Sequence, residues 1–410
     1  MTINCDVLAR MVTPFEGRAS ACCEKNSGLI MKKVTDRALN IPPFIVMDVL
    51  EKAHELEKAG QHIVHLEIGE PDFPTPACIC EAATKAIQDG CTHYTHSLGL
   101  IELREAICRH YAQKYGVHVT PDQIIITSGT SPALFMLFSA ILEPEDEIIL
   151  SDPHYPCYPN FANFLKARPV FVEVEEGDGF QLRTEEIRKK MGTRTRAVLI
   201  NSPSNPTGNL LSPEHMKAMT DLGPYIISDE IYHGLVYEEK EHSILEFTNK
   251  AFVLNGFSKL YAMTGWRLGY IISPIEFVRP MQKIQQNFFI SAGSVSQWAG
   301  VAALEKASPD VEQMRSVYNQ RRKYMIQRLR DLGFGLPVEP AGAFYMLVNA
   351  KHLSRNSYEL AFEMLEKAGV GISPGIDFGQ NAEGYLRFSY ANSLDNIKEG
   401  LDRIEHFLSQ

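Results

Sequence analysis

The sequence predicts an α/β fold in which a mostly parallel sheet is covered by helices on both faces. Short β-branched runs alternate with helical patterns between residues 124 and 275, and this alternation is typical of parallel sheets. The chain has 410 residues, of which 45% are hydrophobic, so it can bury a large core. The seven runs that we predict to be strands are 124–127, 148–150, 170–172, 197–200, 225–227, 252–254 and 268–272.

Helical patterns flank the predicted sheet, and the length of the chain predicts two to three domains. An apolar helix is expected at 133–142, a helix at 44–59 ahead of the sheet, and a long charged helix at 309–332 behind it. We therefore expect residues 66–308 to form a large domain. Residues 309–410 are expected to form a smaller α+β domain, against which the segment 31–65 packs.

The first thirty residues differ from the rest of the chain. Residues 1–30 show no sustained apolar period and carry three of the eight cysteines. A secretory signal contains an apolar stretch of about 7–15 residues, and this segment does not have one. We expect residues 1–30 to be a disordered leader and Met31 to be an alternative start.

Composition and charge exclude several classes of protein. A formal net charge of −10 argues against a nucleic-acid-binding protein. The densest apolar run, at 133–142, is too short for a membrane span, which needs about 18 residues. The eight cysteines are interpreted as reduced thiols of a cytoplasmic protein. Cys78 and Cys80 have no second pair at zinc-site spacing, so no metal is expected.

Polar residues that can bind a ligand or take part in a reaction follow several of the predicted strands. Ser128-Gly129-Thr130 stands between a strand and an apolar helix, which is either an anion cradle or a plain helix start. Asn205 follows the strand at 197–200 in a turn with two prolines, and Asp229 follows the strand at 225–227. In parallel sheets, functional residues gather at these carboxyl ends.

The strand at 252–254 completes this set. It leads into Ser258-Lys259, and Arg267 follows eight residues later, while Tyr232 lies three residues after Asp229. A lysine that forms a Schiff base and an acid for the ring nitrogen are the signature of pyridoxal phosphate. We therefore predict this cofactor, with the phosphate held by the Ser128–Thr130 turn and Arg267.

These residues resemble those of the class I/II aminotransferases of the aspartate aminotransferase superfamily, fold type I, over residues 35–410. The fold implied is a seven-stranded, mostly parallel sheet in a large domain with a smaller α+β domain. The motifs that carry the resemblance are Gly69-Glu70-Pro71-Asp72-Phe73, Tyr94 ahead of Gly99, Ser128-Gly129-Thr130, Asn205-Pro206-Thr207-Gly208, Ser228-Asp229-Glu230-Ile231-Tyr232, Ser258-Lys259, Met263-Thr264-Gly265-Trp266-Arg267 and Leu386-Arg387-Phe388-Ser389.

The resemblance implies a role for each matching residue around the cofactor. Lys259 forms the Schiff base and moves the proton, and Asp229 holds the ring nitrogen protonated. Tyr232 and Asn205 bind the phenolate oxygen. Tyr155 stacks on the ring, although neighbouring Tyr158 is an alternative for this role. The phosphate ligands implied are Ser128, Gly129, Thr130, Ser258 and Arg267.

The resemblance also implies a substrate site and a homodimer. Arg387 takes the substrate α-carboxylate, helped by Asn205 and the backbone of Gly69, although Gly69 could instead serve only a turn. Tyr94 reaches the phosphate of the neighbouring subunit, or is a plain surface residue. Whether Phe344 and Tyr345 line the substrate pocket is left open.

Two departures from the best-studied branch bear on specificity. No arginine lies between Arg279 and Arg315, where dicarboxylate-specific members donate one to the neighbouring subunit, and Ser131 stands where some have lysine. Aspartate is therefore not a favoured substrate. At the phosphate site, Gly256 replaces a serine, which leaves more of the binding to Ser258 and the cradle.

The function predicted is transfer of an amino group from an L-amino acid to a 2-oxo acid, with 2-oxoglutarate as the expected acceptor. The alternative is a C–S β-lyase on the same fold, which would release pyruvate without an added oxo acid. A non-enzymatic regulator is disfavoured by the net charge and by the intact lysine. The sequence does not identify the amino donor.

Overall fold

The computed structural model describes residues 34–410. The predicted leader at 1–30 and the predicted start at Met31 lie outside these residues. The chain divides into two compact units, one ending at Asn40 and one from Ile41 to Gln410. The described part of the first unit contains only the short helix α1 (Asp36–Leu39). Every other described element belongs to the second unit.

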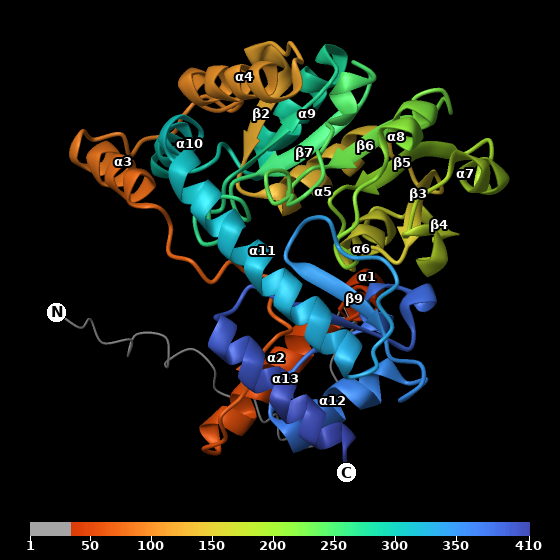
Figure 1. Ribbon diagram of the computed structural model, residues 1–410. Helices are drawn as coiled ribbons and strands as arrows, with labels where there is room; N and C mark the ends of the chain where they lie inside the picture. Colours follow the sequence, from red (N-terminus) through yellow and green to blue (C-terminus); the bar gives the residue numbers. More distant parts are fainter. Residues whose placement is uncertain (1–33) are drawn as a thin grey trace, which may run out of the picture. The chain divides into compact units, whose positions relative to one another are not determined.

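The second unit is built around a seven-stranded sheet (Figure 1). All seven predicted strands are present, which confirms the predicted α/β class. β8 runs antiparallel to β2 and to β7, and the remaining pairs within the sheet are parallel. In spatial order the strands are β2 (Ile124–Thr127), β8 (Gly269–Ile272), β7 (Phe252–Gly256), β6 (Tyr225–Asp229), β5 (Thr195–Asn201), β3 (Glu147–Asp152) and β4 (Arg168–Glu173).

Helices cover both faces of this sheet because the strands are apolar on both sides. Side chains of successive residues, such as Ile124 and Ile125, enter two separate apolar clusters on opposite faces. One cluster contains residues of α5 (Thr130–Ile141), α6 (Cys157–Phe164) and α9 (Ile275–Phe288). The other contains residues of α4 (Ile101–Tyr115), α7 (Thr184–Lys190), α8 (Pro213–Met219) and α10 (Ser294–Lys306), and α10 also packs on α3 (Ala77–Gln88).

The rest of the chain builds two smaller sheets. In one, β12 (Tyr385–Ser389) lies between β9 (Tyr345–Asn349) and β11 (Ser373–Pro374), and in the other β1 (Val64–His65) pairs with β10 (Val370–Gly371). The predicted charged helix is α11 (Ser308–Asp331), which contacts α10 at one end and α13 (Leu394–Leu408) farther along (Figure 1). The predicted helix at 44–59 is α2 (Ile45–Lys58), and it packs on β10, β11 and α12 (Ser357–Ala368). The exact domain boundaries stay a prediction.

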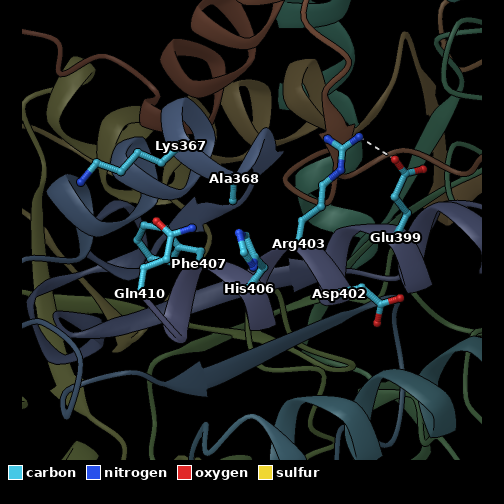
Figure 2. Close-up of a pocket in the computed structure, with 8 residues that line it drawn as sticks. All are labelled: Lys367, Ala368, Glu399, Asp402, Arg403, His406, Phe407 and Gln410. Carbon is cyan, nitrogen blue, oxygen red and sulfur yellow. Dashed lines mark hydrogen bonds and ion pairs between the residues drawn. The ribbon is translucent and has the colours of Figure 1, made fainter.

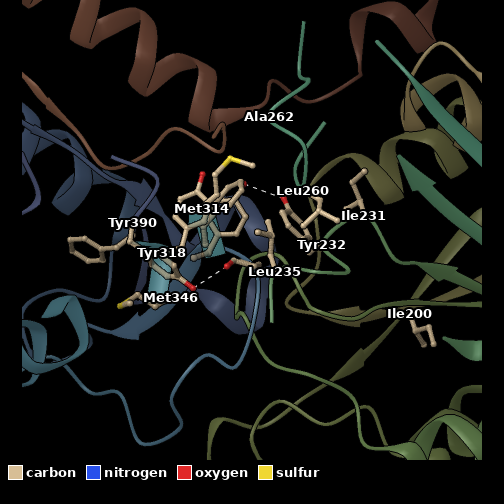
Figure 3. Close-up of a cluster of buried hydrophobic side chains, with 14 of the residues drawn as sticks. Ile200, Ile231, Tyr232, Leu235, Leu260, Ala262, Met314, Tyr318, Met346 and Tyr390 are labelled. Atoms are coloured by element: carbon tan, nitrogen blue, oxygen red, sulfur yellow. Dashed lines mark hydrogen bonds between the residues drawn. The ribbon is translucent and has the colours of Figure 1, made fainter. Parts of the chain in front are cut away.

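One apolar core connects the large sheet with the smaller ones. It includes Tyr232, which follows β6, together with Tyr318 of α11, Met346 of β9 and Tyr390 (Figure 3). The ring of Tyr232 also meets the ring of Phe344 edge-on, with their centroids 5.6 Å apart. The segment that follows β6 is therefore held against the smaller sheet by packing.

Candidate active site

The carboxyl ends of three neighbouring strands meet at one edge of the large sheet. Asn201 ends β5, Asp229 ends β6, and Lys259 follows β7. The register pairs Asn201 with Asp229 and Asp229 with Leu254, so these three strands stop at nearly the same level. A cavity of about 360 Å³ opens at this edge. It collects side chains from segments that are far apart in the sequence.

The structure brings most of the predicted site residues to this cavity. Those that line it are Gly69, Thr130, Tyr155, Asn205, Asp229, Tyr232, Lys259 and Arg387. Four others, Ser128, Gly129, Ser258 and Arg267, do not line it but belong to the segments that begin α5 and follow β7. Tyr94 stands apart, with 82% of its surface exposed.

The Lys259 amine projects into this cavity. Its Nζ donates a hydrogen bond to the carbonyl oxygen of Gly69 at 2.6 Å and lies 5.8 Å from the centre of the Phe344 ring. Burial lowers the pKa of this amine to about 8, and the charge of Arg387 acts in the same direction. At pH 7 about 10% of such an amine is neutral, against well under 1% of an ordinary lysine. The neutral form is the one that attacks carbonyl carbon.

The Asp229 carboxyl is buried in the same cavity. Its Oδ2 accepts a hydrogen bond from the hydroxyl of Tyr158 at 2.7 Å, and its Oδ1 accepts one from the backbone N–H of Ile231 at 3.2 Å. Burial raises the pKa of this carboxyl to about 6, while both hydrogen bonds act to lower it. A carboxylate in this setting favours a cationic N–H partner.

The sequence left the part of Tyr158 undecided between stacking on the ring and packing in the core. Its hydroxyl binds Asp229, whereas Tyr155 lines the cavity and meets Tyr158 edge-on, with ring centroids 5.3 Å apart. The sequence signal that could have found this contact is weak, because the two residues are 71 positions apart.

The turn before α5 packs tightly against Arg267. Gly129 has a φ of +95°, and a Cβ added there would lie 2.6 Å from Nη2 of Arg267. The glycine therefore lets the guanidinium approach the first turn of α5, where N–H groups and the helix dipole attract anions. Nη1 of Arg267 donates to the carbonyl of Thr264 at 3.2 Å. Because a guanidinium has five N–H donors in total, this bond leaves others for an anion. These groups fit a phosphate.

Arg387 forms a second anion site inside the cavity, and it is 2% exposed. Its Nη1 donates to Oδ1 of Asn205 at 3.0 Å, and its Nη2 donates to the carbonyl of Glu67 at 2.6 Å and to Oγ of Ser373 at 3.0 Å. These acceptors are all neutral, and the buried Nε has no partner. A buried guanidinium without a carboxylate at its side favours binding of an anion.

Aromatic rings hold this guanidinium in place. The rings of Tyr345 and Phe378 lie 4.3 and 4.8 Å from its central carbon. The Tyr345 hydroxyl also accepts a hydrogen bond from Tyr232 at 3.2 Å, and a Cβ on Gly69 would come within 2.2 Å of it. Tyr345 therefore lines the cavity, and Gly69 leaves the space that the tyrosine occupies.

The segment that carries Gly69 is tied down on its far side. Asp72 accepts two hydrogen bonds from Arg321 of α11, at 2.7 and 2.9 Å. The hydroxyl of Thr75 donates to the carbonyl of Ala262 at 2.6 Å, in the segment after Lys259. These contacts keep the backbone at Gly69 over the lysine.

Comparison with known proteins assigns the family. The family model for class I and II aminotransferases matches residues 61–404. The chain belongs to the class I and II aminotransferases. This aminotransferase therefore depends on pyridoxal phosphate, as its family does, and the lysine, carboxyl and phosphate cradle described above fit that cofactor.

Several relatives of this aminotransferase match it over all or nearly all of their length. It is 44% identical to the (5-formylfuran-3-yl)methyl phosphate transaminase of Methanocaldococcus jannaschii, over 92% of this chain and 100% of the relative. It is 37% identical to an aspartate aminotransferase of Pyrococcus horikoshii, over 92% and 97%. The crystal structure of the Thermus thermophilus aspartate aminotransferase with maleate superposes with a TM-score of 0.88 at 36% identity, over 92% and 100% of the two chains. The fold is fold type I.

A larger cavity of about 600 Å³ lies between α12 and α13 of this aminotransferase (Figure 2). It contains none of the predicted site residues, and Arg403 in it is paired with Glu399. No helix among residues 34–410 is long and apolar enough to cross a membrane. Within that same range no three histidine, cysteine or acidic side chains gather as metal ligands.

The lowered pKa of Lys259 predicts how this amine reacts in the apoenzyme. Acetic anhydride acylates only neutral amines, so labelling of Lys259 should reach half its maximum near pH 8. Lys85 is an internal control, because its hydrogen bond with Asp89 raises the pKa of that exposed amine. Mass spectrometry of labelled peptides measures both. If Lys259 and Lys85 reached half of their maximum labelling at the same pH, the burial of Lys259 would be contradicted.

The hydroxyl of Tyr158 is predicted to support cofactor binding through Asp229. Tyr158→Phe should weaken the binding of pyridoxal phosphate to the apoenzyme about tenfold, because hydrogen bonds to charged groups contribute about 1.5–3 kcal/mol. Loss of the bond also raises the pKa of Asp229, so the effect should be larger at pH 6 than at pH 8. Fluorescence titration gives the dissociation constants.

Tyr237→Phe is the matched control for this variant. The Tyr237 hydroxyl donates to the carbonyl of Ala343 and does not line the cavity. Equal losses of affinity in the two variants would show that the effect of Tyr158→Phe is general and does not pass through Asp229.

Proposed function

We propose that this aminotransferase transfers the amino group of an L-amino acid to a 2-oxo acid and that 2-oxoglutarate is its acceptor. The observation that carries the proposal is the content of one cavity. It holds an amine of lowered pKa at Lys259, a buried carboxyl at Asp229, and an arginine at 387 that has only neutral partners. These are the groups that cofactor binding, proton transfer and carboxylate binding each require.

Pyridoxal phosphate supplies an aldehyde for the amino group and a ring that takes up electrons. We assign to Lys259 the bond to that aldehyde and the movement of the proton from the substrate Cα. Asp229 would hold a proton on the ring nitrogen, and the hydrogen bond from Tyr158 orients the carboxylate for this task. Tyr232 and Asn205, which line the cavity, would bind the phenolate oxygen, and Tyr155 would pack on the ring. The phosphate is assigned to Ser128, Gly129, Thr130, Ser258 and Arg267.

Arg387 is assigned to the α-carboxylate of both substrates. A guanidinium can bind a carboxylate through two parallel hydrogen bonds. The rings of Tyr345 and Phe378 limit the planes that this guanidinium can adopt, which pre-orients it. Asn205 holds Nη1 at 3.0 Å, and the backbone at Gly69 lies near the Lys259 amine. The amino acid and the oxo acid therefore bind in turn at the same place.

We also propose that the enzyme is a homodimer in the cytoplasm. Tyr94 is 82% exposed, as expected for a residue that serves a neighbouring subunit. Phe288 and Ile290, at the end of α9, are 67% and 48% exposed, and the ring of Phe288 meets that of Phe135. Exposed apolar patches of this kind are typical of interfaces. The free thiols of Cys78, Cys80, Cys91, Cys108 and Cys157 agree with a reducing compartment.

The first half of the proposed reaction can be tested by itself. With single L-amino acids and no oxo acid, the absorbance of the bound cofactor should convert to that of its pyridoxamine form, with one oxo acid formed per site. Lys259→Ala should abolish this conversion, and the exposed Lys85→Ala is the control. Catalytic release of pyruvate without an acceptor would instead identify a β-lyase, and wild-type turnover by Lys259→Ala would refute the assignment of the lysine.

The homodimer is predicted to share its sites between subunits. Sedimentation equilibrium should give twice the mass of one chain. Tyr94→Phe should weaken binding of pyridoxal phosphate without changing this mass, because it removes only a hydroxyl. A monomer that retains full activity would contradict this prediction.

A further inference from the structure

One wall of the catalytic cavity is apolar, and it comes from the beginning of α2. Phe44, Val46, Met47 and Leu50 line the cavity there. Val46 is buried, whereas Met47 keeps 45% of its surface exposed. Ile68, Leu134 and Ile231 add further apolar lining. A bound side chain that reaches this wall would therefore meet hydrocarbon.

The charged groups of the cavity leave no cation for a second carboxylate. Among the described residues that line it, the cations are Lys259 and Arg387, and the anions are Glu70 and Asp229. Both cations already have tasks in the proposed function. The residue at 131 is a serine, which carries no charge. Within this subunit, an acidic side chain would thus lose its hydration without gaining a partner, which is costly, whereas an apolar side chain meets the wall from α2.

The apolar wall is held in a fixed place relative to Arg387. Phe44 is the N-cap residue of α2, and its side chain accepts no hydrogen bond from the first turn of the helix. Instead Asp377, in the short helix η4 (Gly375–Phe378), accepts hydrogen bonds from the backbone N–H groups of Ile45 and Val46 at 3.1 and 3.2 Å. The next residue, Phe378, stacks on Arg387 and shares an apolar cluster with Val46.

We propose that this site selects L-amino acids with uncharged, apolar side chains, and that Asp377 positions the wall that selects them. The proposal rests on the proposed function, because Arg387 must bind the α-carboxylate for the side chain to be directed at the wall. Asp377 does not line the cavity, and its carboxylate holds the first turn of α2. The distance between the wall and Arg387 then sets which side chains fit.

Binding of unreactive carboxylates to the holoenzyme tests the selection without turnover. 3-Phenylpropanoate and succinate both carry a carboxylate for Arg387, but only the first has an apolar end. We expect 3-phenylpropanoate to bind at least about tenfold more tightly in calorimetric titrations, since its ring leaves water for an apolar surface. Equal affinity, or tighter binding of succinate, would overturn the proposal.

A charge placed on the wall should change this preference. Met47→Arg should weaken the binding of 3-phenylpropanoate and strengthen that of succinate, so that their ratio of affinities falls at least tenfold. Ile87→Arg is the matched control, because Ile87 is also an exposed apolar residue on a helix but does not line the cavity. An unchanged ratio in Met47→Arg would show that the wall does not meet the side chain.

The positioning role of Asp377 has its own test. Asp377→Asn should raise KM for L-phenylalanine or L-leucine severalfold with little change in kcat, and Asp377→Glu should recover part of the loss. A fall in kcat alone, with KM unchanged, would overturn the positioning role. Circular dichroism shows whether each variant retains its fold.

Failure of this proposal can be told apart from failure of the proposed function. If L-aspartate converts the cofactor spectrum while L-phenylalanine and L-leucine do not, the selection of apolar side chains is wrong and transamination stands. If no amino acid converts the spectrum, the proposed function is wrong. Conversion by the apolar amino acids in preference to aspartate supports both.

Discussion

The burial of Arg387 is the interaction on which the site depends. Its guanidinium joins segments that are remote in the sequence: Asn205 after the large sheet's β5, the carbonyl of Glu67 after β1, and Ser373 in β11. A buried cation is costly without hydrogen-bond acceptors, and the acceptors of Nη1 and Nη2 are supplied only when these segments come together. The aromatic rings of Tyr345 and Phe378 close the remaining faces. The same arrangement leaves the cation without an anionic partner, which a substrate carboxylate can provide.

Burial also adjusts the chemistry of the two other charged groups. The same loss of hydration that lowers the pKa of the Lys259 amine raises the pKa of the Asp229 carboxyl. Both groups are therefore nearer to neutrality than they would be at a surface. Opposite shifts of an amine and a carboxyl in one cavity are typical of functional sites. The hydrogen bond from Tyr158 limits the shift at Asp229 and favours its charged form.

Most of the large sheet could be predicted because its signals are local. A run such as 252–254 is buried on both faces, so its apolar character shows in the sequence without knowledge of its neighbours. The residues after each strand, such as Asp229 and Lys259, could be placed at one edge by the rule that parallel strands share a direction. Contacts such as that of Tyr158 with Asp229, or of Asp72 with Arg321, could not, because no local pattern links residues so far apart.

The sequence by itself determined the family, the strands, and the places of Lys259 and Asp229 at one edge of the sheet, because each depends on short-range patterns. The tertiary structure alone decided what surrounds these groups. It placed Tyr345 beside Gly69 and Arg387, and it brought Asp377 to the first turn of α2, more than 300 residues earlier in the chain. Pocket shape, burial and the resulting pKa values come from such distant contacts, and those arise only when the whole chain has packed.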